Sequence, residues 1–522
     1  MTTDVDVLIL GGGLAGGLLA RHLRRALPSV SVGVVERRLT SDWKVGESTV
    51  ELAGHYLVKR LGLSSLLYRE HLPKNGLRFF FDQPGRDAPI PSQSELGTTS
   101  FAVNPSFQVD RARLEERLLA LAVADGVTLW RGAKVSQVSL GEPHETQIEQ
   151  DGAVQTVRSR WVVDASGRSR LLARKLGLTR AVPEHQMIAA WGRVHGLGDL
   201  DALGDEGWRA RARHTSRMLS TTHLNYPGYW IWLIPLRDGL TSVGVVGVPQ
   251  DQGGPLSSRA LRSQAGFFEF LKEHKGLEEL LRRSEEPEGA RLLDHGAYLG
   301  LAHRSERYFS PARWALVGEA GSFTDPFYSP GSDFIAQSND LTVEAIRRDL
   351  AGEDLNTFTE LASGFIQHQV SLSVSVYRDQ YMNLGSYDLF RLRYLYDLYN
   401  YFNLLTPYAQ DAHLDPAWLR ERLNTKERTE GALAEAGQLF AQVGRRLQDE
   451  GRYFSGNQGG FDGHFDRAVQ DPTGRSLDDV ARTQRRLHHG VTRRLRRWLA
   501  GDMASPPSSG WMAELWAECA AT

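Results

Sequence analysis

The sequence predicts an α/β fold with a parallel sheet near the N-terminus, an inserted antiparallel sheet and a helical C-terminal region. Val5–Leu10 and Val32–Val35 are nearly continuous apolar runs, as expected of buried parallel strands. Strand-like alternation returns between residues 187 and 248. Beyond Leu341 the apolar spacing is almost wholly helical.

Composition excludes several classes of protein. The chain has 522 residues, 41% of them hydrophobic and 24% charged, with a formal net charge of -2. These values are ordinary for a globular protein and give no sign of a nucleic-acid partner. The first apolar run is too short to span a bilayer, and the single cysteine, Cys519, lacks a disulfide partner and metal-ligand spacing. We therefore expect a cytoplasmic protein without a membrane span or a metal site.

A glycine-rich turn connects the first apolar run to a stretch with helical spacing, Leu18–Leu27. A Gly-x-Gly-x-x-Gly turn at a helix N-terminus lets the backbone approach a pyrophosphate. The turn alone is weak support, but a second strand ends in an acidic residue about twenty residues later, as ribose recognition requires. This unit predicts a Rossmann-like dinucleotide-binding domain, and the candidate cofactor contacts are Gly11, Gly13, Leu14, Ala15, Gly16, Glu36 and Arg37.

Three later segments resemble the glutathione-reductase-like FAD monooxygenases and their halogenase relatives, which favours FAD over NAD. Arg111 opens a helical stretch, Asp164 ends the apolar run of residues 161–163, and Gly318-Glu319-Ala is similar to the Gly-Asp-Ala motif of that family. The resemblance implies that Arg111 lies near the flavin, Asp164 near the adenine half, and Gly318 and Glu319 at the ribityl chain. A surface position for Arg111 and a simple strand-end turn at Asp164 are the structural alternatives.

Two further elements resemble the flavin-dependent halogenases, of the tryptophan and phenol halogenase type. Trp230-Ile-Trp232-Leu-Ile-Pro matches the Trp-x-Trp-x-Ile-Pro signature of that family. Gly46-Glu47-Ser48 is similar to the strap that links the flavin and substrate sites in its members. Alternatively, Ser48 or the threonine after it is the N-cap of the next helix.

Lys74 follows the strap at nearly the distance that separates strap and catalytic lysine in the family. The resemblance implies that it relays hypohalous acid, and a lysine offers three donors and a nucleophilic nitrogen for that purpose. The structural alternative is a solvated surface charge, which most lysines are.

The segment from Thr324 to Ser332 occupies the place of the family's flavin-side loop, where halide meets backbone amides. Pro330 removes one N–H donor, which puts the halide site in doubt, and Asp333 either faces the same pocket or simply begins the next helix. The candidate halide contacts are Ser329, Pro330, Gly331 and Ser332, with Gly331 also a flavin contact. The candidate active-site walls are Trp230, Trp232, Phe327 and Tyr328, and the aromatic pair replaces a glutamate of the tryptophan halogenases, which argues against free tryptophan as substrate.

The expected domains follow from these segments. We assign residues 1–180 to the FAD-binding domain with a strap insertion at about 40–81, residues 181–310 to a β-sheet substrate domain, and 311–345 to the return of the FAD-binding domain. Residues 346–522 form the helical C-terminal region.

Two stretches of this helical region leave alternatives open. The aromatic residues between Tyr377 and Phe402 are either core or the lining of an acceptor pocket. The basic stretch Arg482–Arg497 is either a solvated helix face or a docking surface. The Pro-Pro-Ser-Ser-Gly segment at 506–510 predicts a surface loop.

Together the resemblances predict an FAD-dependent halogenase that uses FADH2, O2 and chloride or bromide. Its substrate is an electron-rich aromatic or related molecule, free or carrier-bound, and Lys74 relays hypohalous acid. Because the chain has no dedicated nicotinamide motif, the reduced flavin is expected from a separate flavin reductase. A monooxygenase on the same scaffold and a non-catalytic flavin-binding partner or maturation protein are the alternatives.

Overall fold

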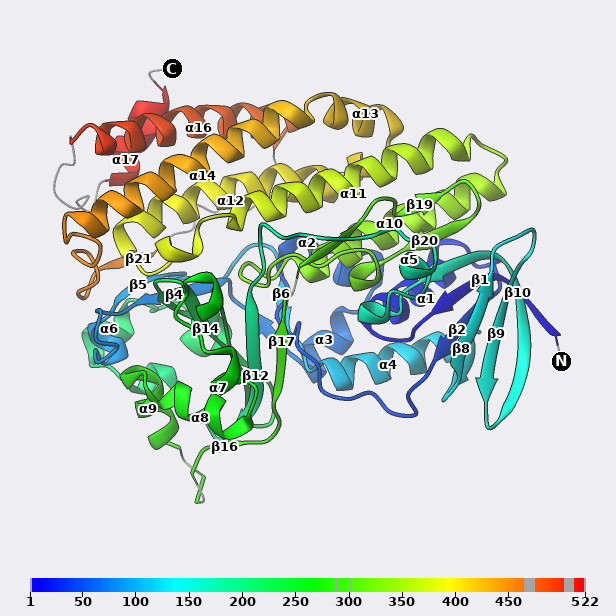
Figure 1. Cartoon of the computed structure of the whole chain (residues 1–522), viewed down its shortest axis with the longest axis horizontal. Helices are drawn as coiled ribbons and strands as arrows, with labels where there is room; N and C mark the ends of the chain where they lie inside the picture. The colour runs from blue at the N-terminus through cyan, green and yellow to red at the C-terminus, as the bar shows by residue number, and fades with distance from the viewer. Residues whose placement is uncertain are drawn as a thin grey trace.

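Two sheets lie beside each other beneath a layer of long helices (Figure 1). The computed structural model describes residues 2–284, 286–287, 289–300, 302–463, 475–501 and 511–520. The predicted segment 506–510 lies outside the described residues. The arrangement confirms the α/β fold class with a helical C-terminal region.

Parallel strands form the centre of the eight-stranded sheet, in the order β19-β20-β10-β1-β2-β7, with β9 beside β10 and β8 beside β9. The segments 128–140 and 146–163 read from the sequence as a small antiparallel layer, which is confirmed for β8, β9 and β10. It is wrong for β7, which pairs in parallel with β2, and β10 also joins the parallel centre through β1. The bounds are β1 Thr2–Leu10, β2 Val32–Glu36, β7 Thr128–Arg131, β8 Lys134–Ser139, β9 His144–Gln150, β10 Ala153–Asp164, β19 Phe309–Ser310 and β20 Trp314–Leu316.

The nine-stranded sheet has the order β16-β12-β15-β14-β13-β4-β5-β21, with β17 beside β12. Strand β4, from the expected strap insertion, pairs with β13 of this second sheet, so residues 40–81 serve both halves of the molecule. The domain boundaries given above stay a prediction. The strands are β4 Leu77–Phe81, β5 Ser94–Gly97, β12 Ile188–His195, β13 Thr221–Tyr226, β14 Tyr229–Pro235, β15 Leu240–Gly247, β16 Arg291–Leu292, β17 Gly296–Leu299 and β21 Phe461–Gly463.

Two small ribbons and a set of helices complete the chain. The ribbons pair β3 (Leu72–Lys74) with β6 (Ser106–Gln108), and β11 (Thr179–Ala181) with β18 (His303–Ser305). The helices packed around the sheets are α1 Leu14–Ala26, α2 Glu51–His55 with a π-helical turn at Tyr56–Arg60, α3 Ser64–Glu70, α4 Arg111–Ala124, α5 Leu171–Lys175, α6 Glu206–Ala210, α7 Ser258–Leu261, α8 Gln264–Lys272 and α9 Lys275–Arg282. The long C-terminal set is α10 Gly331–Leu350, α11 Leu355–Tyr377, α12 Tyr387–Ala409, α13 Pro416–Asn424, α14 Lys426–Asp449, α16 Leu477–Leu499 and α17 Trp511–Ala520.

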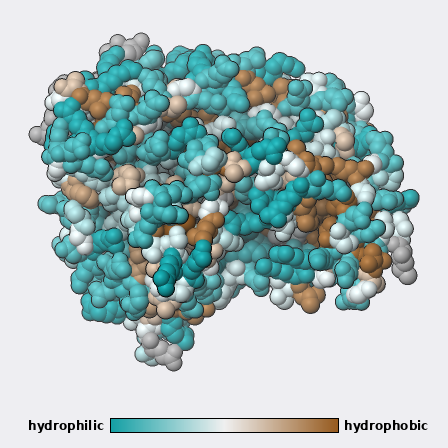
Figure 2. All heavy atoms as spheres, viewed as in Figure 1, coloured by the Kyte–Doolittle hydropathy of each residue, from teal (hydrophilic) through white to brown (hydrophobic). Residues whose placement is uncertain are grey.

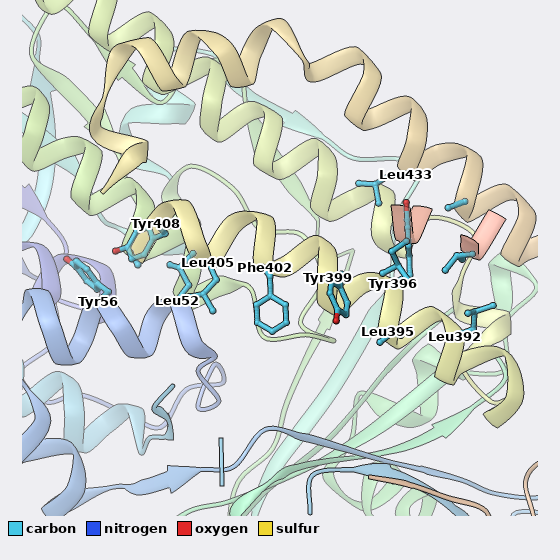
Figure 3. Packing of buried hydrophobic residues seen from close by; sticks show 14 of the residues in the cluster. Leu52, Tyr56, Leu392, Leu395, Tyr396, Tyr399, Phe402, Leu405, Tyr408 and Leu433 are labelled. Carbon is cyan, nitrogen blue, oxygen red and sulfur yellow. The ribbon is translucent and has the colours of Figure 1, made fainter. Parts of the chain in front are cut away.

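The helical layer has a core of its own, built along α12. Figure 3 shows Tyr396, Tyr399 and Phe402 following one another along that helix, with Leu433 of α14 opposite. Helix α16 packs its apolar residues on the same cluster and presents most of its arginines to solvent, as an amphipathic helix does. This face is exposed apart from the buried Arg494, which fits both a solvated face and a docking surface, so the choice between them stays a prediction.

The surface gives little further guidance. On the face shown in Figure 2 it is mostly hydrophilic, with a hydrophobic patch over the eight-stranded sheet. Within the described part of the chain, no helix has the length and apolar character needed to pass through a bilayer.

Candidate functional site

The glycine turn after β1 has the close packing that its sequence predicts. Gly11 has a φ of +111°, and a Cβ there would lie 2.5 Å from the carbonyl oxygen of Ala165. A Cβ at Gly16 would lie 1.9 Å from the carbonyl oxygen of Gly11. Only glycine fits both positions, so α1 begins tightly against the ends of β1 and β10.

Acidic side chains hold this turn and the segment after β10. The carboxylate of Glu36 accepts hydrogen bonds from the N–H of Gly12 at 2.7 Å and of Arg38 at 2.9 Å. Asp164 is fully buried and accepts from the N–H of Ser166 at 3.0 Å and of Leu172 at 2.7 Å. Glu36 thus holds the glycine turn and Asp164 the segment after β10, and the side chain of Arg37 is exposed.

A narrow pocket of about 130 Å³ opens beyond the first turn of α1. It draws together segments that are far apart in the sequence: the start of α1, the strap, the N-terminus of α4, the Trp strand β14 and the loop before α10. The candidate residues in its lining are Leu14, Gly46, Glu47, Ser48, Arg111, Trp230, Trp232, Gly318, Glu319, Ser329, Pro330, Gly331 and Ser332. The remaining cofactor candidates lie at or around the glycine turn instead, and they are Gly11, Gly13, Ala15, Gly16, Glu36, Arg37 and Asp164.

Buried polar contacts fix the strap over the second sheet. Arg193 of β12 forms an ion pair with Glu47 at 2.7 Å, and Ser242 of β15 donates to the other Glu47 oxygen at 3.1 Å. Burial raises the pKa of Glu47 to about 7, against the opposing effect of Arg193. Glu47 is thus an anchor of the strap, and sequence reasoning missed its partner.

Ser48 does not cap a helix. Helix α2 has Val50 at its N-cap, and Thr49 exchanges hydrogen bonds with the backbone of Phe107. The helix-cap alternative is therefore wrong. The Ser48 hydroxyl instead lies 2.9 Å from that of Thr221 in β13.

Arg111 lies against the strap. Its guanidinium forms an ion pair with Glu115 at 2.6 Å and donates to the carbonyl of Val45 at 2.8 Å. Gly46, with a φ of +92°, leaves room for it, because a Cβ there would lie 2.8 Å from the guanidinium. The surface alternative is wrong, since the side chain is only 14% exposed.

Lys74 is a buried lysine, with 4% of its surface exposed. Its Nζ donates to the Ser48 hydroxyl and to the Thr49 carbonyl, both at 2.8 Å. Burial lowers its pKa to about 8, although the carboxyl groups of Glu51 and Asp333 oppose that shift. The solvated-surface alternative is therefore wrong for this residue.

A chain of hydrogen bonds runs from Lys74 to the narrow pocket. The Ser329 hydroxyl donates to the Ser48 hydroxyl at 3.1 Å, and Ser48 in turn accepts from Lys74. Lys74 itself faces a second, larger cavity. Ser48 thus lies on the boundary between the two spaces, and Pro330 lines both.

Helix α10 begins at the edge of the narrow pocket. The N–H of Ser329 donates to the carbonyl of Pro326 at 2.9 Å, and Pro330 has no N–H group. The N–H groups of the first helical turn have no partner within an α-helix, and here they belong to Gly331, Ser332 and Asp333, because the first to bond back is the N–H of Phe334 to the carbonyl of Pro330. The buried Ser332 hydroxyl has no hydrogen-bond partner among the described residues.

Asp333 turns away from that edge. Its carboxyl group accepts from the N–H of Ala53 in α2 at 2.9 Å, and burial raises its pKa to about 8. It belongs to the first turn of α10, so the helix-start interpretation is confirmed.

The predicted aromatic wall is divided between different spaces. Trp230 and Trp232 line the narrow pocket, and Gly244 accommodates the second indole, since a Cβ there would lie 2.2 Å from it. Phe327 lines neither space and packs edge-on against Trp230 at 5.0 Å. Tyr328 lines the large cavity and donates to Asp397 at 3.0 Å.

A buried carboxylate that the sequence analysis did not select holds the loop before α10. Asp325 accepts from the hydroxyl of Tyr381 at 2.6 Å and lies 2.7 Å from Nε2 of His185. Its other oxygen accepts from the N–H of Phe327 at 2.9 Å. The position of Asp325 beside Pro326 was the sequence signal that could have identified it, whereas no sequence signal pointed to His185.

The large cavity has a volume of about 750 Å³ and extends from Lys74 between α11, α12, α14 and α16. Both alternatives for the aromatic stretch apply in part. Tyr377, Tyr394 and Tyr401 line the cavity, whereas Tyr396 and Phe402 belong to the core. Glu51, which sequence reasoning also missed, lines the cavity near Lys74.

Known proteins resemble this chain in sequence and in fold. A family model described as an FAD-binding domain matches residues 4–240. Flavin-dependent halogenase chlA of Dictyostelium discoideum is 28% identical over 475 residues, which cover 84% of this chain and 76% of the relative. The 1H-pyrrole-2-carbonyl-(peptidyl-carrier protein) chlorinase of Pseudomonas fluorescens is 26% identical over 347 residues, 63% of this chain and 72% of the relative. Over most of its length the chain is thus similar to flavin-dependent halogenases, and an FAD-binding domain model matches its N-terminal part.

Solved halogenase structures agree with the fold. The halogenase PltM in complex with phloroglucinol and FAD superposes with a TM-score of 0.65 at 16% identity, covering 94% of this chain and 98% of that one. The flavin-dependent brominase Bmp2 has a TM-score of 0.60 at 22% identity, covering 82% and 100%. These likenesses concern the fold, and the curated flavin-dependent halogenases that the sequence resembles indicate that the chain is an enzyme.

Proposed function

We propose that this enzyme uses FADH2, O2 and chloride or bromide to halogenate an electron-rich aromatic substrate, with Lys74 as the catalytic residue. The observation that supports this most directly is the position of Lys74. It is buried, it faces the large cavity, and it reaches the narrow pocket through Ser48 and Ser329.

The residues present suit FAD. The glycine turn leaves the backbone open to a pyrophosphate, and a positive φ of 58° at Gly318 opens the same region near α1. When bound as FADH2, the cofactor would activate O2, and the activated oxygen would oxidise the halide. In this proposal Trp230 and Trp232 wall the ring site, and Arg111, Gly46 and the Gly318–Glu319 segment hold the cofactor.

We assign the halide site to the N-terminus of α10. Two backbone N–H groups, of Gly331 and Ser332, and the unpaired Ser332 hydroxyl meet there at the edge of the narrow pocket. A helix N-terminus and a small nest of donors favour an anion. Pro330 contributes no donor, and Asp333 is directed away, so it does not repel the halide there.

Lys74 would then receive hypohalous acid from the pocket side and present it to the cavity side. Two of its three N–H bonds are taken up by Ser48 and Thr49, which leaves one to hold the oxidant. Glu51 and Asp333 favour the charged form of the lysine and act as positioning residues. Tyr377, Tyr394 and Tyr401 line the path of an aromatic acceptor.

The relatives support an aromatic acceptor but differ in how it is presented. One relative is named as a chlorinase of a pyrrole on a peptidyl-carrier protein, and the PltM structure contains phloroglucinol. We propose that this enzyme accepts an electron-rich ring of the same general class, free or carrier-bound. We also propose a cytoplasmic reaction with FADH2 supplied by a separate flavin reductase.

The test compares Lys74→Met with Lys59→Met, a change of an exposed lysine in the π-helical turn. Each protein receives FAD, a flavin reductase with NADH, O2, bromide and a panel of phenols and pyrroles, and products are measured by mass. Lys74→Met should lower bromination by about 100-fold or more while FAD affinity stays within about twofold. Lys59→Met should behave as the unchanged enzyme.

Other outcomes identify the alternatives. A product that gains oxygen whether or not bromide is present would identify a monooxygenase. Flavin binding without oxidation of any acceptor in the panel would identify a non-catalytic flavin-binding partner protein.

A further inference from the structure

The large cavity contains an arginine without a counter-charge. Arg422 of α13 lines the cavity, and its Nε is buried without a hydrogen-bond partner among the described residues. Burial lowers its pKa, and the one carboxylate that opposes this shift is its neighbour Glu421, which forms no ion pair with it in the described structure. Its nearest described support is the face of Trp418, with 5.5 Å between the guanidinium carbon and the ring centroid.

Several buried arginines of the chain have carboxylate partners. Arg78 and Arg217 share Glu95, and Arg193 pairs with Glu47. Arg422 is partly buried and forms no ion pair among the described residues. Removing part of a guanidinium from water without a counter-charge is costly, because the lost hydration is not replaced.

The neighbours of Arg422 do not neutralise it. Glu430 of α14 lies 3.0 Å from Nδ1 of His368 and 4.0 Å from Nζ of Lys426. Arg422 and Lys426 both lower the pKa of His368, so these positive groups lie close together. Glu430 is thus engaged by His368 and Lys426, and it forms no ion pair with Arg422 in the described structure.

The position of Arg422 in the cavity indicates what that anion belongs to. Lys74 lies at the buried end of the cavity, whereas exposed residues of α14 and α16, among them Arg428 and Arg485, line it at the helical end. Arg422 belongs to that helical end, on α13 directly before α14. A ligand that reaches from Lys74 toward solvent would pass its guanidinium.

We propose that Arg422 forms an anion subsite for the acceptor substrate, which carries a carboxylate or phosphate group remote from the ring that is halogenated. This inference rests on the proposed function, because that function makes the large cavity the acceptor site. The oxyanion belongs either to a free aromatic acid or to the phosphopantetheine arm of a carrier protein. A guanidinium recognises both through charge-assisted hydrogen bonds.

The experiment measures binding to the full chain with oxidised FAD, by calorimetry or ligand-observed NMR, without halide or turnover. The first pair of probes is 3,5-dihydroxybenzoate and its methyl ester, and the second is 4′-phosphopantetheine and pantetheine. We expect the anionic member of one pair to bind about tenfold or more tightly than its neutral partner. A preference in the first pair assigns a free acid, and in the second a carrier arm.

Arg422→Met should reduce that preference to about twofold or less, and Arg422→Lys should retain part of it. The matched control is Arg420→Met, a change on the exposed face of the same helix, which should retain the full preference. Equal affinities within both pairs, or no binding of any probe, would overturn the proposal, as would a preference that survives in Arg422→Met. If Arg422→Met does not fold, Arg422→Gln takes its place.

The outcome is separable from that of the proposed function. The anion preference is measured by binding alone, without halide or turnover, so it holds or fails whether or not an acceptor is halogenated. If the protein binds anionic probes through Arg422 but halogenates no acceptor, the result supports the anion subsite and contradicts the proposed halogenase mechanism.

Discussion

Two carboxyl groups favour the charged form of Lys74. Burial lowers its pKa to about 8, and Glu51 is the first of the two carboxyl groups that oppose this shift. In the proposed reaction the ammonium group donates the hydrogen bond that holds hypohalous acid. The proton on Lys74 therefore matters at pH values close to neutral.

The pH dependence of halogenation follows from that position. Below pH 8 Lys74 is mostly protonated, and above it mostly neutral, so the rate should fall as pH rises through about 8. Glu51→Gln removes a negative neighbour, which disfavours the ammonium form and should move the fall to lower pH. The measurement is the initial rate of bromination from pH 6 to 10 at saturating FADH2 and bromide.

A matched variant isolates the lysine in this profile. Lys74→Arg keeps a positive charge that does not titrate in this range, so its residual activity should not fall near pH 8. A rate that rises through pH 8 in the unchanged enzyme would mean that the neutral amine is the active form, contrary to this prediction.

Ser332 should determine halide affinity. Its buried hydroxyl has no partner in the described structure, so Ser332→Ala removes a donor from the proposed halide site without breaking a bond. We expect the KM for bromide to rise about tenfold or more, as the loss of one hydrogen bond to a charged group predicts, while the KM for the acceptor is unchanged. Ser136→Ala, in the distant strand β8, is the control. An unchanged bromide KM would place the halide elsewhere.

The strap is an element with little regular structure, and buried charges hold it in position. Glu47 pairs with Arg193, and Ser48 contacts Thr221, so the strap is bound to β12, β13 and β15 of the second sheet. A segment without its own ladder of hydrogen bonds depends on such contacts for a single conformation.

Breaking the pair of Glu47 with Arg193 should lower both the stability of the protein and its affinity for FAD. Arg193→Met leaves Glu47 buried without its counter-charge, which costs about 3–5 kcal/mol of unfolding free energy. Arg180→Met removes the exposed pair with Glu306 and should cost less than about 1 kcal/mol. Thermal unfolding with and without FAD measures both effects, and FAD affinity should fall only in Arg193→Met. Equal stability of the two variants would show that the strap does not need this pair.

Local patterns made part of the fold and site predictable. The glycine turn, the two strands around it and the Trp strand depend on residues close in sequence, whose periodicity and spacing carry the signal. The pairing of β4 with β13 joins residues about 144 positions apart, as in Leu77 with Thr221, and no local pattern encodes it. The partner of Glu47 was hidden for the same reason.

Side-chain direction was the second limit on prediction. Phe327 and Tyr328 are adjacent, yet one packs against Trp230 and the other lines the large cavity. Arg422 has the sequence environment of a solvated helical arginine, and the packing of α13 against α11 partly buries it. Such assignments depend on tertiary contacts.

At the scale of the whole molecule, the layer of helices over the two sheets contains one space and the sheets another. The narrow pocket lies between the sheets and the strap, and the large cavity lies among the helices. Lys74, Ser48 and Pro330 lie where the two spaces approach each other. Flavin chemistry and acceptor binding should therefore respond separately to substitutions.

A bulky residue in the cavity tests that separation. Ala432 of α14 lines the large cavity, and Ala434 on the same helix is exposed. Ala432→Trp should reduce halogenation of the acceptor by about tenfold or more, because an indole occupies space that the acceptor needs. FAD affinity and oxygen consumption by reduced flavin should remain within about twofold of the unchanged enzyme, and Ala434→Trp should alter none of the three. Product formation, flavin fluorescence and an oxygen electrode measure them in parallel. If Ala432→Trp weakens FAD binding as much as it weakens halogenation, the two spaces act as one site, and the acceptor enters beside the flavin rather than through the helical layer.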